Sequence, residues 1–214
     1  MSQYKLNQLQ EAIFRTLGAK DTRVDELKLR LKRLLVTDRR LGRGKRSENK
    51  ADRRYAFYSH KPLGSGVEVM FSGYEAFALL AALIVLEYGI PQAKVVSILQ
   101  DVRSDLEAAH HETLQKDPKV LFDPEAVRAM ARPGMIAVDN TEPVFLAFVR
   151  LDAGKGRVRA FISVCRGHDE LVNFISEHSV PGSGATHFEL ARLMHTVADN
   201  LSKTRPIKRG RSTL

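Results

Sequence analysis

Apolar residues recur at helical spacing near the start of the chain. Leu6, Leu9, Ile13 and Leu17 are separated by three or four residues, which places their side chains on one face of a helix. Gly18 follows directly, and glycine commonly ends a helix because it adopts the left-handed conformation without strain. The pattern therefore predicts one amphipathic helix over this stretch.

A second amphipathic helix is predicted after a short turn. Asp21 or Thr22 can cap its first turn, and an apolar stripe at helical spacing follows at Val24, Leu27, Leu31 and Leu34. Arg23, Arg30 and Arg33 fall on the opposite, exposed face. Two short helices of which the second is basic match the helix-turn-helix plan, in which the second helix lies in the major groove of DNA. An ordinary helical hairpin with a solvated charged face is the alternative.

The pattern then changes from helical spacing to alternation. Tyr55 and Phe57 stand two residues apart in RRYAFYS, which predicts a strand because aromatic residues favour a pleated surface. Residues 33–36, RLLV, could lead into the first strand of a β-wing, with RRYAFYS as its second strand. The basic stretch 42–53 would then be the tip of this wing, and its cations could reach phosphates. A disordered basic loop that binds polyanions without fixed geometry is the alternative.

Two more helices are predicted beyond the wing. Ser72 can cap a helix through GYEAFALLAALIVLEY, which is apolar on so many sides that it must be buried, and Gly89 ends it. Pro91 then begins a helix that continues to Gln115, with an apolar seam at Val95, Ile98, Leu99, Val102 and Leu106. The seam is longer than a small domain needs, which predicts a partner helix from a second subunit and hence a homodimer.

The last third of the chain predicts a small α+β domain. Residues 136–151 and 157–165 have strand patterns joined by a tight turn, and helices are expected over 168–178 and 186–203. The whole chain is therefore expected to be α+β. The expected divisions are a DNA-binding domain with its dimerisation helix at 1–115, a linker at 116–132, the α+β domain at 133–203 and a basic disordered tail at 204–214.

Charge is segregated along the chain. Residues 1–62 hold 17 Lys/Arg and 7 Asp/Glu, residues 63–202 hold 12 and 18, and residues 203–214 hold five basic residues and no acidic one, within a net charge of +9. A basic N-terminal module and tail around an acidic body suit a polyanionic partner, with nucleic acid ahead of anionic membrane. The Arg209–Arg211 core resembles the centre of an AT-hook, but a solvated basic tail is the favoured interpretation.

The order of elements resembles the DNA-binding domain of the mercury-resistance regulator (MerR) family. In that family a helix-turn-helix precedes a wing with an aromatic-rich end, two helices separated by glycine, and a dimerising coiled coil. RRYAFYS at 53–59 stands where that wing ends, and YEAFALLAALIVLEYGIPQAKVVSILQDV at 74–102 stands where the two helices follow. The resemblance covers residues 5–115 and implies a winged helix-turn-helix fold that binds double-stranded DNA as a dimer.

These patterns together predict a sequence-specific DNA-binding transcription regulator. A non-specific nucleic-acid-binding or nucleoid-associated protein is the alternative, and the C-terminal domain is expected to sense an effector or bind a protein. The longest apolar run, Ala76–Leu86, is shorter than the roughly 20 residues that a bilayer requires, so a cytoplasmic, nucleoid location is expected. The residues expected to contact DNA are Arg23, Arg30, Arg33, Arg39, Arg40, Arg43, Lys45, Arg46, Arg53 and Arg54.

No enzyme, metal site or cofactor is predicted, and an enzyme built on Cys165 and His168 is the third hypothesis. Cys165 and His168 lie close in sequence, but no third residue beside them would orient the imidazole, and a lone cysteine at a strand end usually packs as a small hydrophobe or senses redox state. Glu107 and His110 form a single Glu-x-x-His, where di-iron bundles use two. The glycine-containing loops lack the spacing that cradles a phosphate.

Overall fold

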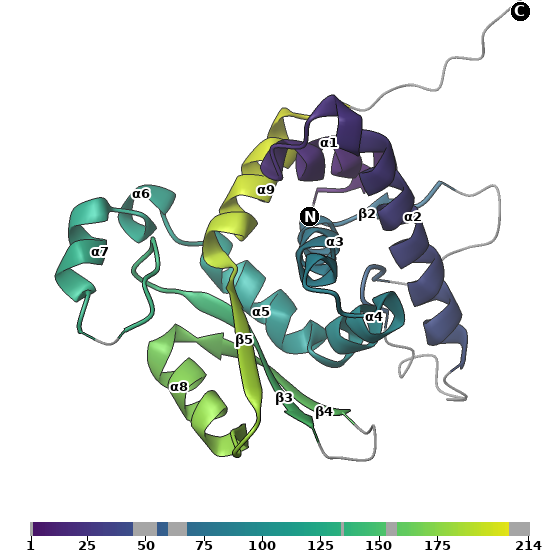
Figure 1. Ribbon diagram of the computed structural model, residues 1–214. Coiled ribbons are helices and arrows are strands. Elements are labelled where there is room, and N and C mark those ends of the chain that lie inside the picture. Colours follow the sequence, from purple (N-terminus) through teal and green to yellow (C-terminus); the bar gives the residue numbers. More distant parts are fainter. Residues whose placement is uncertain (1, 45–54, 60–67, 134, 153–157, 206–214) are drawn as a thin grey trace, which may run out of the picture. The chain divides into compact units, whose positions relative to one another are not determined.

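The computed structural model describes residues 2–44, 55–59, 68–133, 135–152 and 158–205 (Figure 1). The chain divides into two compact units, which are described separately. The first unit is Met1–Asp101 together with Thr196–Leu214, and the second is Val102–His195. The second unit is therefore an insertion in the sequence of the first. Among the described residues, no helix is both long and apolar enough to cross a membrane.

The first unit consists mainly of helices. Its elements are α1 (Leu6–Thr16), α2 (Asp21–Gly44), α3 (Gly73–Glu87), α4 (Gln92–Asp101) and the later part of α9 (Ala191–Lys203), with a short antiparallel ribbon of β1 (Tyr4–Lys5) and β2 (Met70–Phe71). Leu9 and Ile13 are fully buried, as the spacing predicts, and Gly18 follows α1 with a φ of +57°. The expected α+β class with a helical N-terminal region is confirmed.

Helix α3 is the buried centre of the first unit. Ser72 and Glu75 form a reciprocal capping box, in which Glu75 N donates to Ser72 Oγ at 3.2 Å and Ser72 N donates to Glu75 Oε2 at 2.7 Å. Phe77 and Leu79 have no exposed surface, and α3 packs against α1, α2 and α4. The expected cap and the expected burial of this helix are both correct.

The end of α9 completes the packing of α1, which the sequence did not indicate. The Gln8 side-chain amide donates to Thr204 Oγ1 at 3.4 Å, and Asn200 Nδ2 donates to Thr16 Oγ1 at 3.0 Å. Residues 196–204 thus pack in the first unit, with Val197, Leu201 and Thr204 buried. The expected basic tail lies outside the described residues from position 206 onward.

The expected first arm of the wing is wrong, because residues 33–36 lie inside α2, which continues to Gly44. Leu31, Leu34 and Leu35 are buried, so the apolar stripe keeps helical spacing through this stretch and holds it against the first unit's core. The described part of RRYAFYS, residues 55–59, contains no strand. Residues 45–54, the expected wing tip, lie outside the described residues.

The helix expected from Pro91 to Gln115 is interrupted at Val102, where α4 ends and α5 (Arg103–Leu114) begins. Its apolar seam is already covered by the chain itself. Val95 and Leu99 are fully buried on α4, which packs against α2 and α3, and Leu106 is fully buried on α5, which packs against β4 (Val158–Arg166). The seam is therefore buried within the chain and is not a surface for a second subunit. It no longer supports the predicted homodimer, which stays a prediction.

The second unit is a small α+β arrangement, as expected. Its antiparallel sheet has the order β4-β3-β5, with β3 at Val144–Asp152 and β5 at Gly184–Glu189. Helix α8 (Gly167–His178) packs on one face of this sheet through a core of Phe145, Ala147, Cys165 and Leu171. Short helices α6 (Pro118–Leu121) and α7 (Pro124–Met130) occupy most of the expected linker.

The helix expected over 186–203 begins later than predicted. Residues 184–189 form β5, in which Phe188 pairs with Leu146 and is buried, so tertiary pairing overrides the helical pattern there. Helix α9 starts only at Ala191, whose backbone N donates to Glu189 Oε1 at 2.8 Å. Burial raises the pKa of Glu189.

Candidate functional site

A buried carboxylate in α2 fixes the segment that returns to it. Asp38 has no exposed surface, and its Oδ1 and Oδ2 accept the backbone N–H groups of Ala56 at 3.0 Å and Phe57 at 2.9 Å. Gln100 on α4 donates to Oδ1 at 2.7 Å. A buried carboxylate is costly unless its oxygens accept hydrogen bonds, and here three donors from two parts of the chain meet that requirement.

Aromatic packing seats the same segment against the end of α2. The Arg39 Nε donates to Tyr58 Oη at 3.1 Å, and its guanidinium carbon lies 5.2 Å from the Tyr58 ring centroid. Burial raises the pKa of Tyr58 to about 12. The Tyr55 ring lies so close to Gly42 that a Cβ placed on this glycine would be 2.3 Å from Tyr55 Cε1. Residues 55–58 are therefore buried anchors, where the sequence had predicted a strand.

These contacts lie on either side of the basic segment, which is defined here as residues 45–54. Residues 45–54 connect Gly44, the last residue of α2, to Tyr55, which packs against that same helix. Residues 43–54 contain six Lys/Arg and two Asp/Glu. The basic stretch therefore leaves from the C-terminal end of α2, and the residue that follows it packs against the same end.

The structure separates the expected DNA contacts into distinct groups. Arg23 and Arg30 form ion pairs with Glu87 at 3.4 and 2.5 Å, and Arg30 also pairs with Glu26 at 2.6 Å. Arg39 is held by Tyr58 and is half-buried. Arg43 lies in α2 but its side chain is not described, and the remaining expected contacts, Lys45, Arg46, Arg53 and Arg54, lie outside the described residues.

Arg33 and Arg40 remain as exposed arginines on α2 with no ion-pair partner among the described residues. They belong to an exposed stripe at steps of three and four residues, here called the α2 face, which comprises Leu29, Lys32, Arg33, Val36 and Arg40. Leu29 is 47% exposed and Val36 is 57% exposed. The α2 face therefore combines three cations with two apolar side chains and has no carboxylate.

Charge follows the division into units. The residues of the first unit include 23 Lys/Arg and 12 Asp/Glu, a formal net charge of +11, whereas those of the second include 11 and 13, a net charge of −2. The whole positive excess of the chain therefore belongs to the unit that contains α2. A polyanion would be attracted to this unit and not to the other.

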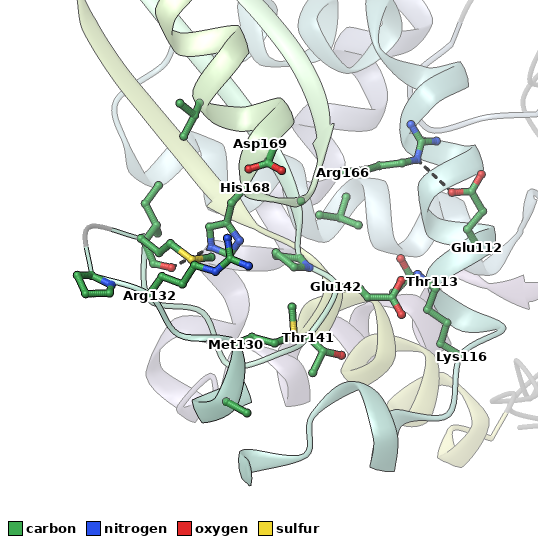
Figure 2. A pocket seen from close by; sticks show the side chains of 18 residues that line it. Glu112, Thr113, Lys116, Met130, Arg132, Thr141, Glu142, Arg166, His168 and Asp169 are labelled. Carbon is green, nitrogen blue, oxygen red and sulfur yellow. Dashed lines mark hydrogen bonds and ion pairs between the residues drawn. The ribbon is translucent and has the colours of Figure 1, made fainter. Parts of the chain in front are cut away.

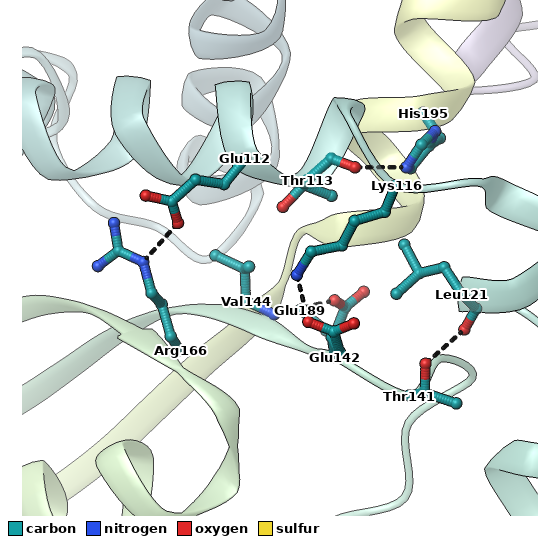
Figure 3. Close-up of polar contacts among 10 residues, drawn as sticks. All are labelled: Glu112, Thr113, Lys116, Leu121, Thr141, Glu142, Val144, Arg166, Glu189 and His195. Atoms are coloured by element: carbon teal, nitrogen blue, oxygen red, sulfur yellow. Dashed lines mark hydrogen bonds and ion pairs between the residues drawn. The ribbon is translucent and has the colours of Figure 1, made fainter.

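The second unit contains a cavity of about 740 Å³ (Figure 2). Its lining comes from the end of α5, from the connection between α7 and β3, and from the start of α8. Two ion pairs cross its lining, as Figure 3 shows: Arg166 Nε to Glu112 Oε2 at 3.1 Å, and Lys116 to Glu142. These two ion pairs neutralise four of the charged side chains that line the cavity.

The described parts of the connection between α7 and β3, residues 131–133 and 135–143, are held at several points. His168 Nε2 lies 2.9 Å from Ile136 O, and because a carbonyl oxygen only accepts, this nitrogen carries a proton. Thr141 N donates to Leu121 O at 2.9 Å, and Arg192 pairs with Asp139. Side-chain and backbone contacts thus hold Ile136, Asp139 and Thr141 in place.

The other candidate residues from the sequence, Cys165, Glu107 and His110, are buried or form an ion pair within the second unit. Cys165 is 2% exposed within the apolar core of the second unit, and this burial raises the pKa of its thiol. Glu107 pairs with Arg103 at 3.5 Å, and His110 is buried, which lowers its pKa to about 4. Within the described part of the chain, no three His, Cys, Asp or Glu side chains gather where they could hold a metal ion.

Asp38 and the cavity were both missed from sequence. For Asp38 a signal was present, because it continues the spacing of Leu27, Leu31 and Leu34 and so falls on the buried side of α2. The cavity had no comparable signal, since its residues come from three separate parts of the second unit.

No family model, curated protein or solved structure matches the chain.

Proposed function

We propose that the first unit binds double-stranded DNA through the α2 face and the basic segment that follows it. The observation that supports this most directly is the hydrogen bonding of Asp38, which holds Ala56 and Phe57, just after that segment, against the C-terminal half of α2. Arginine and lysine side chains make many of the phosphate contacts in protein–DNA complexes, and both the α2 face and the segment after it contain them.

The α2 face has the chemistry that base-edge contacts need. Arginine can donate two hydrogen bonds to guanine, and an apolar side chain can contact the thymine methyl group. Arg33 and Arg40 would supply the first kind of contact, and Leu29 and Val36 the second. Arg23 and Arg30 have a smaller part in this proposal, because carboxylates already neutralise them. We propose a transcription regulator as the biological role.

Non-specific binding to nucleic acid is the competing proposal. It is favoured by the net charge of +11 in the first unit, because electrostatic attraction to phosphates is independent of sequence. Selection from a random DNA pool distinguishes the two. A defined motif that becomes degenerate when Leu29 and Val36 are replaced by alanine supports the regulator, whereas an undefined mixture of bound sequences supports the non-specific binder.

The binding test compares the double variant Arg33→Ala/Arg40→Ala with the natural chain by fluorescence anisotropy on duplex DNA. Loss of two phosphate or base contacts should weaken binding and lower the slope of log K against log salt by up to about 2 units. The matched control is Lys119→Ala/Arg128→Ala, which removes two exposed charges from the second unit. Equal slopes for both variants, or no binding by the natural chain at about 50 mM salt, would overturn the proposal.

A further inference from the structure

The cavity of the second unit contains one cation and one carboxylate that other side chains do not neutralise. Its lining has six formally charged side chains, of which four form the Arg166–Glu112 and Lys116–Glu142 pairs. Arg132 and Asp169 are exposed and have no ion-pair partner among the described residues. The charges available to a ligand are therefore one of each sign.

The rest of the lining is largely apolar. Met130, Met135 and Val172 have exposed fractions of 48%, 36% and 55%, so hydrophobic side chains lie uncovered at this cavity. Ile136 adds to them, and its carbonyl is held by His168. Methionine side chains adapt to the shape of a bound apolar group because they are unbranched and polarisable. An uncovered apolar lining with a few polar groups is typical of small-molecule sites.

Arg132 is the positive group of the lining that remains available to a ligand. The start of α8 adds little to it, because Asp169 and Glu170 lie in the first turn of that helix. In addition, Arg166 N donates to Glu170 Oε2 at 2.7 Å and Gly167 N donates to Pro143 O at 2.8 Å. Arg132 and the His168 imidazole are drawn on one side of the cavity in Figure 2, and Glu112 and Lys116 on the other. The favoured place for an anionic group is therefore beside Arg132.

We propose that this cavity binds a small zwitterion with an apolar body, of the class of a free aliphatic α-amino acid. Its carboxylate pairs with Arg132 near the start of α8, its ammonium group pairs with Asp169, and its side chain contacts Met130 and Met135. The volume of about 740 Å³ is within the range of roughly 300–1,000 Å³ that small-molecule sites occupy. A dianion is disfavoured, because Glu112, Glu142 and Asp169 all line the same cavity.

Isothermal titration calorimetry on the full chain tests this inference with four probes. These are L-leucine, L-leucinamide, which lacks the carboxylate, 4-methylpentanoate, which lacks the ammonium group, and 3-methylbutylamine, which lacks the carboxylate and has the same apolar body. Leucine should bind saturably, and each of the other three should bind at least about 10-fold more weakly, because each loses a charge-assisted hydrogen bond.

Two variants identify the groups responsible. Arg132→Gln and Asp169→Asn should each weaken leucine binding about 10-fold or more, and Asp169→Asn should leave the affinity for 4-methylpentanoate unchanged. The matched controls are Arg128→Gln on α7 and Glu177→Gln at the far end of α8, both exposed and outside the lining. Thermal unfolding of all four variants shows whether each still folds.

Three results would overturn the inference. They are the absence of saturable leucine binding below about 10 mM, equal affinity for leucine and 4-methylpentanoate, and unchanged leucine binding by folded Asp169→Asn or Arg132→Gln protein. The inference does not depend on DNA binding by the first unit. A chain that binds leucine but not DNA would retain it, and a chain that binds DNA but not leucine would lose it.

Discussion

The carboxylate of Asp38 accepts the backbone N–H of Phe57 at 2.9 Å, across 19 residues of the chain. Both residues are completely buried. The residues between them include the whole basic segment proposed to contact DNA, and the Asp38 side chain holds the residues that follow this segment against α2. Stability of the first unit and DNA affinity are therefore expected to be linked through Asp38.

Replacing Asp38 with alanine should lower the free energy of unfolding by about 3 kcal/mol or more, because three buried donors would lose their acceptor. Denaturant unfolding measures this change, and native-state hydrogen exchange should show faster exchange at the Ala56 and Phe57 amides. The control is Asp25→Ala, which removes an exposed carboxylate from an ion pair with Lys28 and should cost less than about 1 kcal/mol. Similar losses in the two variants would contradict the anchoring role of Asp38.

Gly42→Ala should destabilise the first unit by about 1–3 kcal/mol, because the added Cβ would lie 2.3 Å from the Tyr55 ring. Gly73→Ala is a matched control, since a Cβ there meets nothing within 4 Å and alanine favours a helix. Chemical denaturation compares the two variants. The second replacement Tyr55→Leu should recover part of the Gly42→Ala loss, and a double variant whose losses simply add would argue against this contact.

His110 should make the second unit sensitive to acid. Burial lowers its pKa to about 4, with further lowering by His111 and His195, whereas the unfolded chain should protonate it near 6.5. Between these two pKa values the unfolded state binds more protons than the folded state. The contribution of His110 to the free energy of unfolding is therefore fully present above about pH 6.5, and it falls by up to about 3 kcal/mol as the pH drops to about 4. His110→Gln should flatten this part of the pH dependence, while His111→Gln at an exposed position should leave it largely intact. Denaturant unfolding between pH 4 and pH 7 is the measurement.

The Cys165 thiol should react slowly with a disulfide reagent in the native protein. It is 2% exposed, and burial raises its pKa, so both access and thiolate content are low. The reaction rate should rise with denaturant in parallel with unfolding of the second unit, and the fully unfolded chain provides the reference rate. Rapid modification without denaturant would indicate an accessible thiol and would revive the redox-sensing interpretation.

Local patterns predicted the parts of the fold that local physics determines. The helices that begin after Lys5 and Ser72, and the glycines that follow them at Gly18 and Gly89, depend on spacing and capping within a few residues. The wing was predicted wrongly because Tyr55 and Phe57 alternate as in a strand, yet both are buried on account of partners far away in sequence. A single sequence contains little information about such partners.

The same limit applies to the candidate sites. The sequence indicated a basic segment as a DNA-contacting site, which stays a prediction. It did not distinguish Arg33 and Arg40 from arginines that are neutralised by Glu87 or packed on Tyr58. The cavity could not be predicted, because Arg132 and Asp169 come from parts of the chain that only folding brings to one lining.

The hydrogen bond between Gln8 and Thr204 joins residues 196 positions apart. During synthesis at about 5–20 residues per second, Gln8 would wait roughly 10–40 s before its partner is made. In that interval the face of α1 that contacts residues 196–204 has no α9 to cover it. Since the whole of the second unit, Val102–His195, is made before Thr204, the first unit is expected to complete its packing only after the inserted unit has been synthesised.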